Sequence, residues 1–152
     1  MPRGTGSAAF LLAQVGAHAA AEFAKRLSTL TLAPPHAGIL RAIEAAPGLS
    51  QQALSTMLRI LPSRLVSLLD ELEGRGLLER RSHPDDRRTY ALHLTEKGRQ
   101  ALEAISRLAR EHGDSLCAAL NEKEREQLTS LLLRIAEQQG LAAGVHPGFG
   151  RI

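Results

Sequence analysis

The central part of this 152-residue sequence changes its hydrophobic period, and this change limits the fold more than any other feature. Over residues 51–58 and 62–74, apolar residues return every three or four positions, the period of a helix with one buried face. Over residues 77–82 and 89–94, the pattern is that of two strands, and the polar residues 83–88 separate them. The sequence therefore predicts two helices joined by a tight turn and followed at once by a β-hairpin.

Longer amphipathic segments flank this central part. Residues 8–30 and 36–46 each carry apolar side chains at helical spacing, and residues 96–139 hold two more helices. The second of these begins at Asn121, which forms a capping-box pattern with Glu124. We also expect Ser50 to cap the helix that starts at residue 51, and Thr95 to cap the helix that starts at residue 96. Because a hairpin follows the helix-turn-helix directly, the predicted fold class is mainly α (α+β), a winged helix-turn-helix between long terminal helices.

We expect a single domain, because 152 residues leave little room for two. The winged lobe is predicted over residues 34–95, and residues 141–152, with three glycines and a proline, are predicted to be a flexible tail. The single cysteine, Cys117, excludes an internal disulfide, and its place beside an apolar stripe predicts a buried, unreactive thiol.

Composition and charge limit the class of partner only weakly. The formal charge of +3 and the pI of about 9.6 permit a polyanionic partner without establishing one. Aromatic residues make up only 3%, so the core must be built from Leu, Ile, Val and Ala. The apolar run near the N-terminus is interrupted by Gln14, Gly16 and His18, which favours a packed helix over a secretory signal. We therefore expect a cytoplasmic protein that does not enter a membrane.

Four short motifs follow one another between residues 49 and 99: Leu72-Glu73-Gly74-Arg75-Gly76-Leu77, Glu79-Arg80, Asp86-Arg87-Arg88 and Leu94-Thr95-Glu96-Lys97-Gly98. In this order and spacing they resemble the winged-helix core of the MarR family (multiple antibiotic resistance regulators). The resemblance implies a homodimeric, DNA-binding transcriptional regulator, often a repressor released by a small ligand. Residues 8–30 and 96–139 would then supply the dimerisation helices.

The expected partners follow from this resemblance. They are a double-stranded DNA operator, a second copy of the chain, and a small aromatic or phenolic ligand, with no cofactor. Two recognition helices related by a two-fold axis would read a pseudo-palindrome whose half-sites lie about one helical turn, roughly 10 bp, apart.

Candidate DNA contacts lie on the second helix of the motif, on the start of the first, and on the hairpin. A helix with a polar N-terminal face can enter the major groove, and Arg64 is a candidate for a bidentate contact with guanine. The alternative for Arg64 is a contact with phosphate or with an acidic side chain. The full set of candidates is Ser50, Gln51, Pro62, Ser63, Arg64, Ser67, Arg81, Asp86, Arg87 and Arg88.

The hairpin tip is rich in arginine. Residues 80–88 hold four arginines against two aspartates, and arginine suits a narrow, strongly negative minor groove. The family resemblance implies that Asp86 orients Arg88 through a charge-assisted hydrogen bond, and we expect Arg87 to reach phosphate. A solvated charged loop is the alternative.

Two positions depart from the family pattern. Arg59 stands where the turn commonly has glycine, so we expect a left-handed turn there to be either strained or reshaped. Leu61 stands where a serine or threonine commonly caps the recognition helix, and Ser63 could take over as the cap of a helix that starts later. These departures favour the alternative of a winged-helix protein-interaction module without DNA binding.

The signal that such a regulator would sense is less well defined. His18, His36 and His112 are candidates for binding a phenolate or carboxylate, and ordinary surface histidines are the alternative. No two of them have the four-residue spacing of a helical metal pair, so we expect no metal site, although a metal- or redox-sensing variant stays an alternative. The sequence has no nucleophile elbow or phosphate loop, so we expect no catalytic residues and no enzyme activity.

Overall fold

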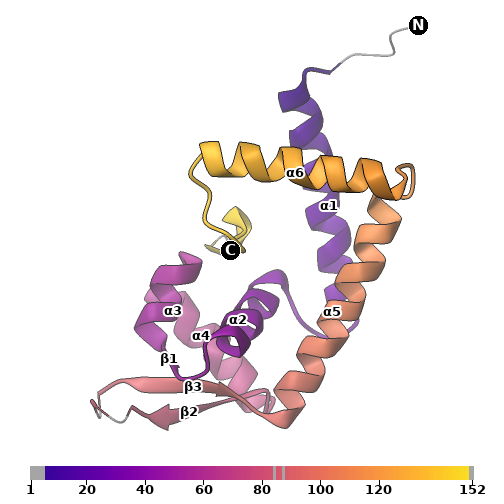
Figure 1. Cartoon of the computed structure of the whole chain (residues 1–152). Helices are drawn as coiled ribbons and strands as arrows, with labels where there is room; N and C mark the ends of the chain where they lie inside the picture. The colour runs from indigo at the N-terminus through magenta and orange to yellow at the C-terminus, as the bar shows by residue number, and fades with distance from the viewer. Residues whose placement is uncertain (1–5, 84, 87, 151–152) are drawn as a thin grey trace, which may run out of the picture.

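The structure is a computed structural model that describes residues 6–83, 85–86 and 88–150. Within these residues the chain forms a winged lobe and a group of longer helices, which confirms the predicted fold class (Figure 1). The elements, in chain order, are α1 (Ala8–Ser28), α2 (Pro34–Ala45), β1 (Leu49–Ser50), α3 (Gln51–Leu58), α4 (Pro62–Gly74), β2 (Leu78–Ser82), β3 (Tyr90–Leu94), α5 (Glu96–Leu116), α6 (Glu122–Gln138) and the 3-10 helix η1 (Pro147–Gly150).

The hairpin is the main part of an antiparallel sheet with the strand order β1-β3-β2. β2 and β3 pair in the predicted way, with Arg80 opposite Leu92. The sequence did not predict β1, whose residue Leu49 also lies opposite Leu92, on the other side of β3. A two-residue strand is too short to show an alternating pattern, so only its pairing reveals it.

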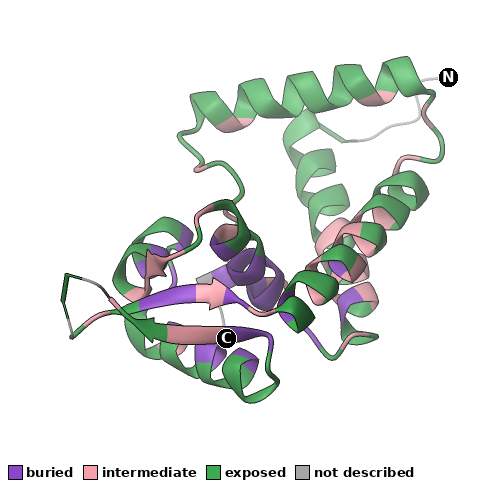
Figure 2. Cartoon of the chain, turned by 60° about the horizontal axis from the view of Figure 1, so that its bottom comes forward, coloured by how far each residue is buried: buried purple, intermediate pink, exposed green. Residues whose placement is uncertain are grey.

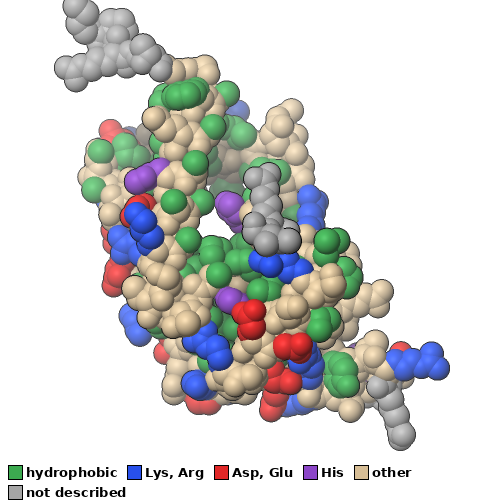
Figure 3. Space-filling model, turned by 180° about the vertical axis from the view of Figure 1, so that it is seen from behind, with side chains coloured by type: hydrophobic (Ala, Val, Ile, Leu, Met, Phe, Trp, Pro, Cys, Tyr) green, Lys and Arg blue, Asp and Glu red, His purple; other side chains and the backbone are tan. Residues whose placement is uncertain are grey.

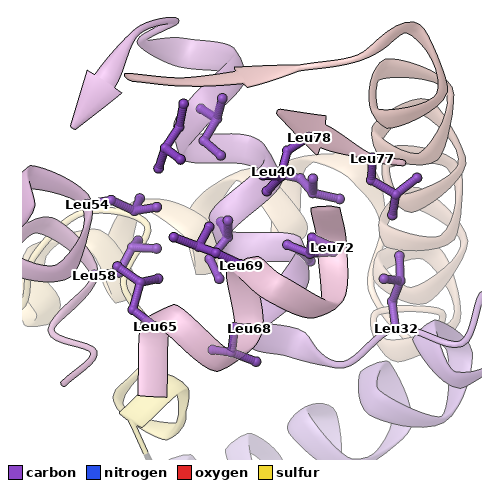
Figure 4. Close-up of a cluster of buried hydrophobic side chains, with 14 of the residues drawn as sticks. Leu32, Leu40, Leu54, Leu58, Leu65, Leu68, Leu69, Leu72, Leu77 and Leu78 are labelled. Atoms are coloured by element: carbon purple, nitrogen blue, oxygen red, sulfur yellow. The ribbon is translucent and has the colours of Figure 1, made fainter. Parts of the chain in front are cut away.

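The hydrophobic core lies in the winged lobe, where helices α2, α3 and α4 pack beneath the sheet (Figure 4). Its members are almost all leucine and isoleucine, as the low aromatic content predicts. Leu27 of α1 and Ile105 of α5 are both fully buried and join the flanking helices to this core. Figure 2 shows that buried residues gather in the lobe, whereas α6 and the first half of α1 are largely exposed.

Helix α4 is held in place by polar contacts with the start of α2 and with the segment that joins α1 to α2. His36 Nδ1 accepts a hydrogen bond from the Ala33 N–H at 2.9 Å, so in neutral His36 the proton is on Nε2, which lies 2.9 Å from Glu71 Oε2. At the end of α4, the Arg75 guanidinium donates to the Leu30 carbonyl at 2.9 Å and also to the carbonyl of Thr31. These contacts set the orientation of α4 relative to the flanking helices.

The hairpin meets α5 at a very close backbone contact. The Thr95 side chain accepts from the Gly98 N–H at 3.0 Å, which caps α5 as predicted, and it donates to the Gly76 carbonyl at 2.6 Å. A Cβ atom added at Gly98 would lie 1.9 Å from the Leu77 carbonyl oxygen. Only glycine fits at this position, because any side chain would occupy the space of that carbonyl.

Helix α5 ends at Leu116, although apolar residues continue at helical spacing in the sequence as far as Leu120. The Arg125 side chain provides the reason, because its Nε donates to the carbonyls of Cys117 and Leu120 at 3.2 and 3.1 Å. These bonds satisfy carbonyls that a continuing helix would use. Cys117 follows the last residue of α5 and is half-buried in the single chain, whereas the sequence predicted a buried thiol.

The capping box of α6 is confirmed: Asn121 and Glu124 each accept a hydrogen bond from the other's backbone N–H at 2.9 Å. After α6 the chain returns to the winged lobe (Figure 1). There η1 packs on α2, and Phe149, only 9% exposed, lies against Gly38. The described part of segment 141–152, predicted to be flexible, is thus docked on α2, because a large aromatic side chain finds a site at a glycine.

Candidate nucleic-acid interface

A groove of about 560 Å³ lies between the helix pair α3–α4 and the hairpin. Three of the predicted DNA-contacting residues line it together: Gln51 at the start of α3, Pro62 at the start of α4, and Arg88 on the hairpin. The other lining residues are Gln52, Ser55, Leu65, Val66, Arg80, Thr89 and Tyr90. The fold therefore brings parts of all three predicted segments to one concave surface.

Of the two outcomes expected at Arg59, the turn between α3 and α4 shows the left-handed backbone, with φ 55° and ψ 39°, and is not reshaped. A buried hydroxyl supports this turn, since Ser55 donates to the Ile60 carbonyl at 2.6 Å. The side chain of Ile60 is 2% exposed and anchors the turn in the core. The turn keeps its shape without glycine because contacts on both sides of Arg59 hold it.

The prediction that Ser63 caps α4 is wrong. The helix begins at Pro62, and Leu61 precedes it with no side-chain hydrogen bond to the helix. Pro62 starts the helix because its fixed φ already fits the first turn. The amides of Ser63 and Arg64 lie in this first turn and have no intrahelical acceptor, so they are available to an anion such as phosphate.

The outer face of α4 is less polar than the sequence suggested. Ser63 and Ser67 are exposed as predicted, but Val66 lies between them at 38% exposure and Leu61 precedes them at 69%. Apolar side chains at such positions can contact the methyl group of thymine. The sequence does indicate that Val66 is exposed, since Val66 falls outside the buried stripe of α4. That stripe consists of Leu65, Leu68, Leu69 and Leu72.

Arg64 does not line this groove. Its side chain lines a second concavity, between α1, α2 and the C-terminal segment. The Nε atom of Arg64 is buried and has no hydrogen-bond partner among the residues that the structure describes. The predicted base contact by Arg64 thus requires another rotamer than the one seen here.

The hairpin tip is shaped by Asp86, but not in the predicted way. Asp86 Oδ1 accepts a hydrogen bond from the backbone N–H of Arg88 at 2.9 Å, and the Asp86 carbonyl accepts from the N–H of Thr89 at 3.2 Å. Among the described ion pairs, none joins Asp86 to the guanidinium of Arg88. Asp86 therefore sets the backbone turn and leaves the Arg88 side chain exposed. Arg87 lies outside the described residues.

Two of the four arginines at residues 80–88 are paired with acids. Arg80 lies 2.8 Å from Asp70 and 3.2 Å from Glu73, and its side chain is only 14% exposed. Arg81 pairs with Glu79 on the same strand. The count of charges over residues 80–88 is therefore incomplete, because carboxylates of α4 and β2, outside that range, neutralise two of the four arginines.

Ser50 and Gln51 have different roles. The Ser50 hydroxyl accepts from the Ala53 N–H at 3.0 Å and caps α3, as the sequence predicts. Ser50 also pairs with Ala91 in the sheet. Gln51 has its side chain on the groove. Of the two, Gln51 is the better placed to reach DNA.

The three predicted ligand histidines do not form one site. His112 stacks on Phe23 with 5.3 Å between ring centroids, and burial, together with the Arg26 guanidinium, lowers the pKa of His112. His18 is close enough to contribute to the same lowering. His36 is used in the contact between α2 and α4 described above. None of the three is among the residues that line the second concavity.

Comparison with known proteins identifies the family. The profile of the MarR family matches residues 28–89. A protein of Thauera aromatica assigned as a transcriptional regulator of the hcr operon is 36% identical over 118 residues, which are 77% of this chain and 71% of that protein. The chain belongs to the MarR family.

Solved structures of MarR-family proteins resemble this chain over most of its length. The transcriptional repressor CouR, solved on a 23-mer DNA duplex, is 35% identical and superposes with a TM-score of 0.76 over 86% of this chain and 92% of that one. A MarR-family protein of Mycobacterium tuberculosis in complex with salicylic acid is 25% identical, with a TM-score of 0.69 over 86% of this chain and 97% of that one. The resemblance found in the sequence is thus confirmed, and this chain is a MarR-family transcriptional regulator.

Two further observations concern membrane spans and metal ligands in this MarR-family chain. In the part that the structure describes, no helix is both long and apolar enough to cross a membrane. Within that same part, no three His, Cys, Asp or Glu side chains are grouped so that they could hold a metal ion.

Proposed function

We propose that this chain is a repressor that binds a pseudo-palindromic operator as a homodimer, with α4 in the major groove and the hairpin beside the minor groove. The observation that carries the proposal is the groove that joins Gln51, Pro62 and Arg88 on one surface. The similarity to CouR, which was solved on duplex DNA, supports DNA as the partner.

The contacts divide into two kinds. We infer that Val66, Ser63 and Ser67 read base edges, because they are the exposed side chains of the first two turns of α4. Arg88 supplies an exposed positive charge at the hairpin, where Asp86 shapes the backbone beneath it. Arg80 stays with Asp70 and Glu73 and acts as part of the scaffold.

Exposed apolar side chains support the homodimer. The first half of α1 exposes Phe10, Leu11, Leu12 and Val15, and α6 exposes Leu128, Leu131, Leu132, Leu133 and Ile135. No residue of α6 is buried in the single chain. Contiguous apolar surface of this kind is unusual on a monomer, and a second copy would cover it through the same two helices. Equilibrium sedimentation should therefore show a dimer, and Leu131→Asp together with Leu132→Asp should shift it toward monomer.

Selection from random duplex DNA tests the DNA-binding proposal directly. We expect an enriched palindrome with half-sites about 10 bp apart. Enrichment of no motif, or of a motif without two-fold symmetry, would count against the proposal and in favour of a winged-helix interaction module.

The contribution of the hairpin is measured on the selected duplex by fluorescence anisotropy at several salt concentrations. Arg88→Ala should weaken binding about tenfold or more, and it should make the slope of log affinity against log salt shallower by about one contact. Arg110→Ala is the matched control, because it removes the same charge from an exposed position on α5. If both variants lose the same affinity for the duplex, Arg88 acts only through the net charge of the protein. The assignment of Arg88 as a DNA contact of the hairpin would then be wrong.

We also propose that a small aromatic ligand releases the repressor from DNA. The complex of the Mycobacterium tuberculosis relative with salicylic acid supports this part of the proposal. A ligand can act in this way only if it binds more tightly to a form of the dimer that does not fit the operator. Operator affinity measured with and without salicylate tests the proposal, and an unchanged affinity would contradict it for this ligand.

A further inference from the structure

The exposed face at the start of α4 carries apolar side chains that the core does not use. Leu61, the residue before the helix, is 69% exposed, and Val66 in its second turn is 38% exposed. Neither of them is among the core residues of the winged lobe. Val66 lines the groove between the helix pair and the hairpin, and so does Pro62, which follows Leu61 directly. Both apolar side chains therefore lie at the surface proposed to bind DNA.

The one charged residue of this stretch points elsewhere. Over residues 61–69 only Arg64 carries a charge, and it lines the second concavity, which measures about 680 Å³. The other walls of that concavity come from α1, the start of α2 and the C-terminal segment with Phe149. The face of the molecule seen in Figure 3 is hollowed near its middle, where hydrophobic side chains gather and Lys or Arg side chains lie beside them. In this conformation the guanidinium of Arg64 does not face the groove, so it makes no bidentate contact with guanine there.

The polar groups that remain on this face of α4 discriminate weakly between bases. They are the hydroxyls of Ser63 and Ser67, and Ser67 donates to the Ser63 carbonyl at 3.4 Å. Because a hydroxyl both donates and accepts hydrogen bonds, a serine can contact any base pair. The contact by which α4 distinguishes one base from another therefore falls to its apolar side chains.

We propose that Leu61 and Val66 read the C5-methyl groups of thymine, so that each half-site of the operator carries thymine at two positions that face the start of α4. Thymine is the one base of the four that presents a methyl group in the major groove, and apolar side chains select it by contact with that group. This inference rests on the proposed function, because it names the bases that the same surface selects. Ser63 and Ser67 contact base edges beside these methyl groups without selecting among bases.

The two side chains are placed to meet different base pairs. Leu61 and Val66 are separated by about 7.5 Å along the axis of α4, at 1.5 Å per residue. This separation is roughly two base-pair steps. The Leu61 side chain makes no hydrogen bond to the helix that it precedes, and its high exposure leaves it available to DNA.

Removal of single methyl groups from the duplex tests the inference. Deoxyuridine lacks the C5-methyl group of thymidine and keeps all of its hydrogen-bonding groups. On the selected duplex, fluorescence anisotropy should show two thymines of each half-site at which deoxyuridine weakens binding by about three- to fourfold, the loss expected for one buried methyl group. Deoxyuridine at thymines of the flanking sequence is the matched control and should leave the affinity unchanged.

The return of the methyl group on another base is the converse test. Cytosine paired with guanine, in place of one of these thymine pairs, should weaken binding, because both the methyl group and the O4 acceptor are lost. 5-Methylcytosine at the same position restores the methyl group alone. We expect it to bind about three- to fourfold more tightly than cytosine.

Protein variants show which side chain reads which methyl group. Val66→Ala should weaken binding to the thymine duplex, and deoxyuridine at one position of each half-site should then cost this variant nothing. Leu61→Ser should behave in the same way at the other position, and the new hydroxyl can cap α4, so the helix is kept. Leu141→Ala is the control, because it removes an exposed apolar side chain outside α3, α4 and the hairpin. Thermal unfolding of each variant confirms that it is folded.

The outcomes are distinct. The inference is overturned if deoxyuridine leaves the affinity unchanged at every thymine of the half-sites, and the proposed function then still stands on the selected palindrome. It is also overturned if deoxyuridine weakens the wild type and both variants by the same factor, because the effect would then belong to the DNA alone. A wild-type protein that binds no duplex would contradict the proposed function, and the inference would fail with it.

Discussion

Replacement of Gly98 by alanine tests the close contact between the hairpin and α5. The added Cβ would lie 1.9 Å from the Leu77 carbonyl oxygen and 2.9 Å from its carbonyl carbon. The backbone at residue 98 and the Leu77 carbonyl must move apart by about 1.1 Å before the Cβ–oxygen distance reaches 3.0 Å. Below 3.0 Å, contacts of a Cβ atom are essentially never found. Both atoms belong to backbone, so no flexible side chain can move aside.

The cost follows from what such a shift would break. Overpacking of a tight site costs about 1–3 kcal/mol, and the shift would also strain the 2.6 Å bond from Thr95 to the Gly76 carbonyl and the 3.2 Å bond from the Thr95 N–H to the Leu77 carbonyl. Each such hydrogen bond contributes about 1 kcal/mol. Alanine gains about 1 kcal/mol in helix propensity over glycine, which offsets part of the loss. We therefore expect Gly98→Ala to lower the free energy of unfolding by about 2–4 kcal/mol.

Gly113→Ala is the matched control, because it is on the same helix and its Cβ would meet no atom within 4 Å. We expect it to raise the free energy of unfolding by up to about 1 kcal/mol. The assay is urea denaturation at one fixed protein concentration, since the stability of a dimer depends on concentration. In a thermal scan, Gly98→Ala should lower the Tm by about 5–15 °C. A Gly98→Ala variant within about 0.5 kcal/mol of the wild type would refute the steric reasoning.

Three further predictions concern the helix turn and the helix interface. Ser55→Ala should lower the free energy of unfolding by about 1–2 kcal/mol, because the Ile60 carbonyl loses its donor. Ser67→Ala removes an exposed hydroxyl and should change the free energy of unfolding by less than about 0.5 kcal/mol. Arg59→Gly should raise the free energy of unfolding by about 0.5–1 kcal/mol, because glycine removes the cost of the left-handed backbone. Arg59→Ala should not raise the free energy of unfolding. Burial and Arg26 lower the pKa of His112 below its ordinary 6.5. The contribution of His112 to the free energy of unfolding is therefore present above pH 6.5 and is lost as the pH falls. His112→Gln should flatten the dependence of the free energy of unfolding on pH.

Denaturation experiments decide each of these. Equal effects of the two serine variants would show that the buried hydroxyl contributes nothing to the turn. A gain in stability from Arg59→Ala as large as that from Arg59→Gly would remove the left-handed backbone as the cause. An unchanged pH profile in His112→Gln would mean that other groups govern the acid side of the stability curve.

Local features of the sequence were sufficient to predict most of the secondary structure. The caps Ser50, Thr95 and Asn121 were all found where they were expected. Each depends only on neighbours within about four residues, and the geometry of a turn or a helix start is the same in any protein. The two-residue strand β1 is the exception, because it exists only through its pairing with β3.

The interface was predicted in outline and corrected in its contacts. Arg80 and Arg88 look alike in the sequence, yet one is held by Asp70 and Glu73 and the other is exposed. Asp86 was expected to hold a guanidinium and instead holds a backbone amide. The difference depends on which acidic side chains α4 places beside β2, and this placement depends on packing between two elements.

The sequence alone therefore determined the order of the elements, the change from helical to alternating period, and the family. The tertiary structure alone decided that Arg64 lines a cavity, that Phe149 closes one wall of it, and that Gly98 must be glycine. The physical reason is the distance along the chain over which each effect acts. Hydrophobic period and capping depend on residues that are only a few positions apart. The surroundings of Arg64, Phe149 and Gly98 are instead built from segments that meet only when the chain is folded.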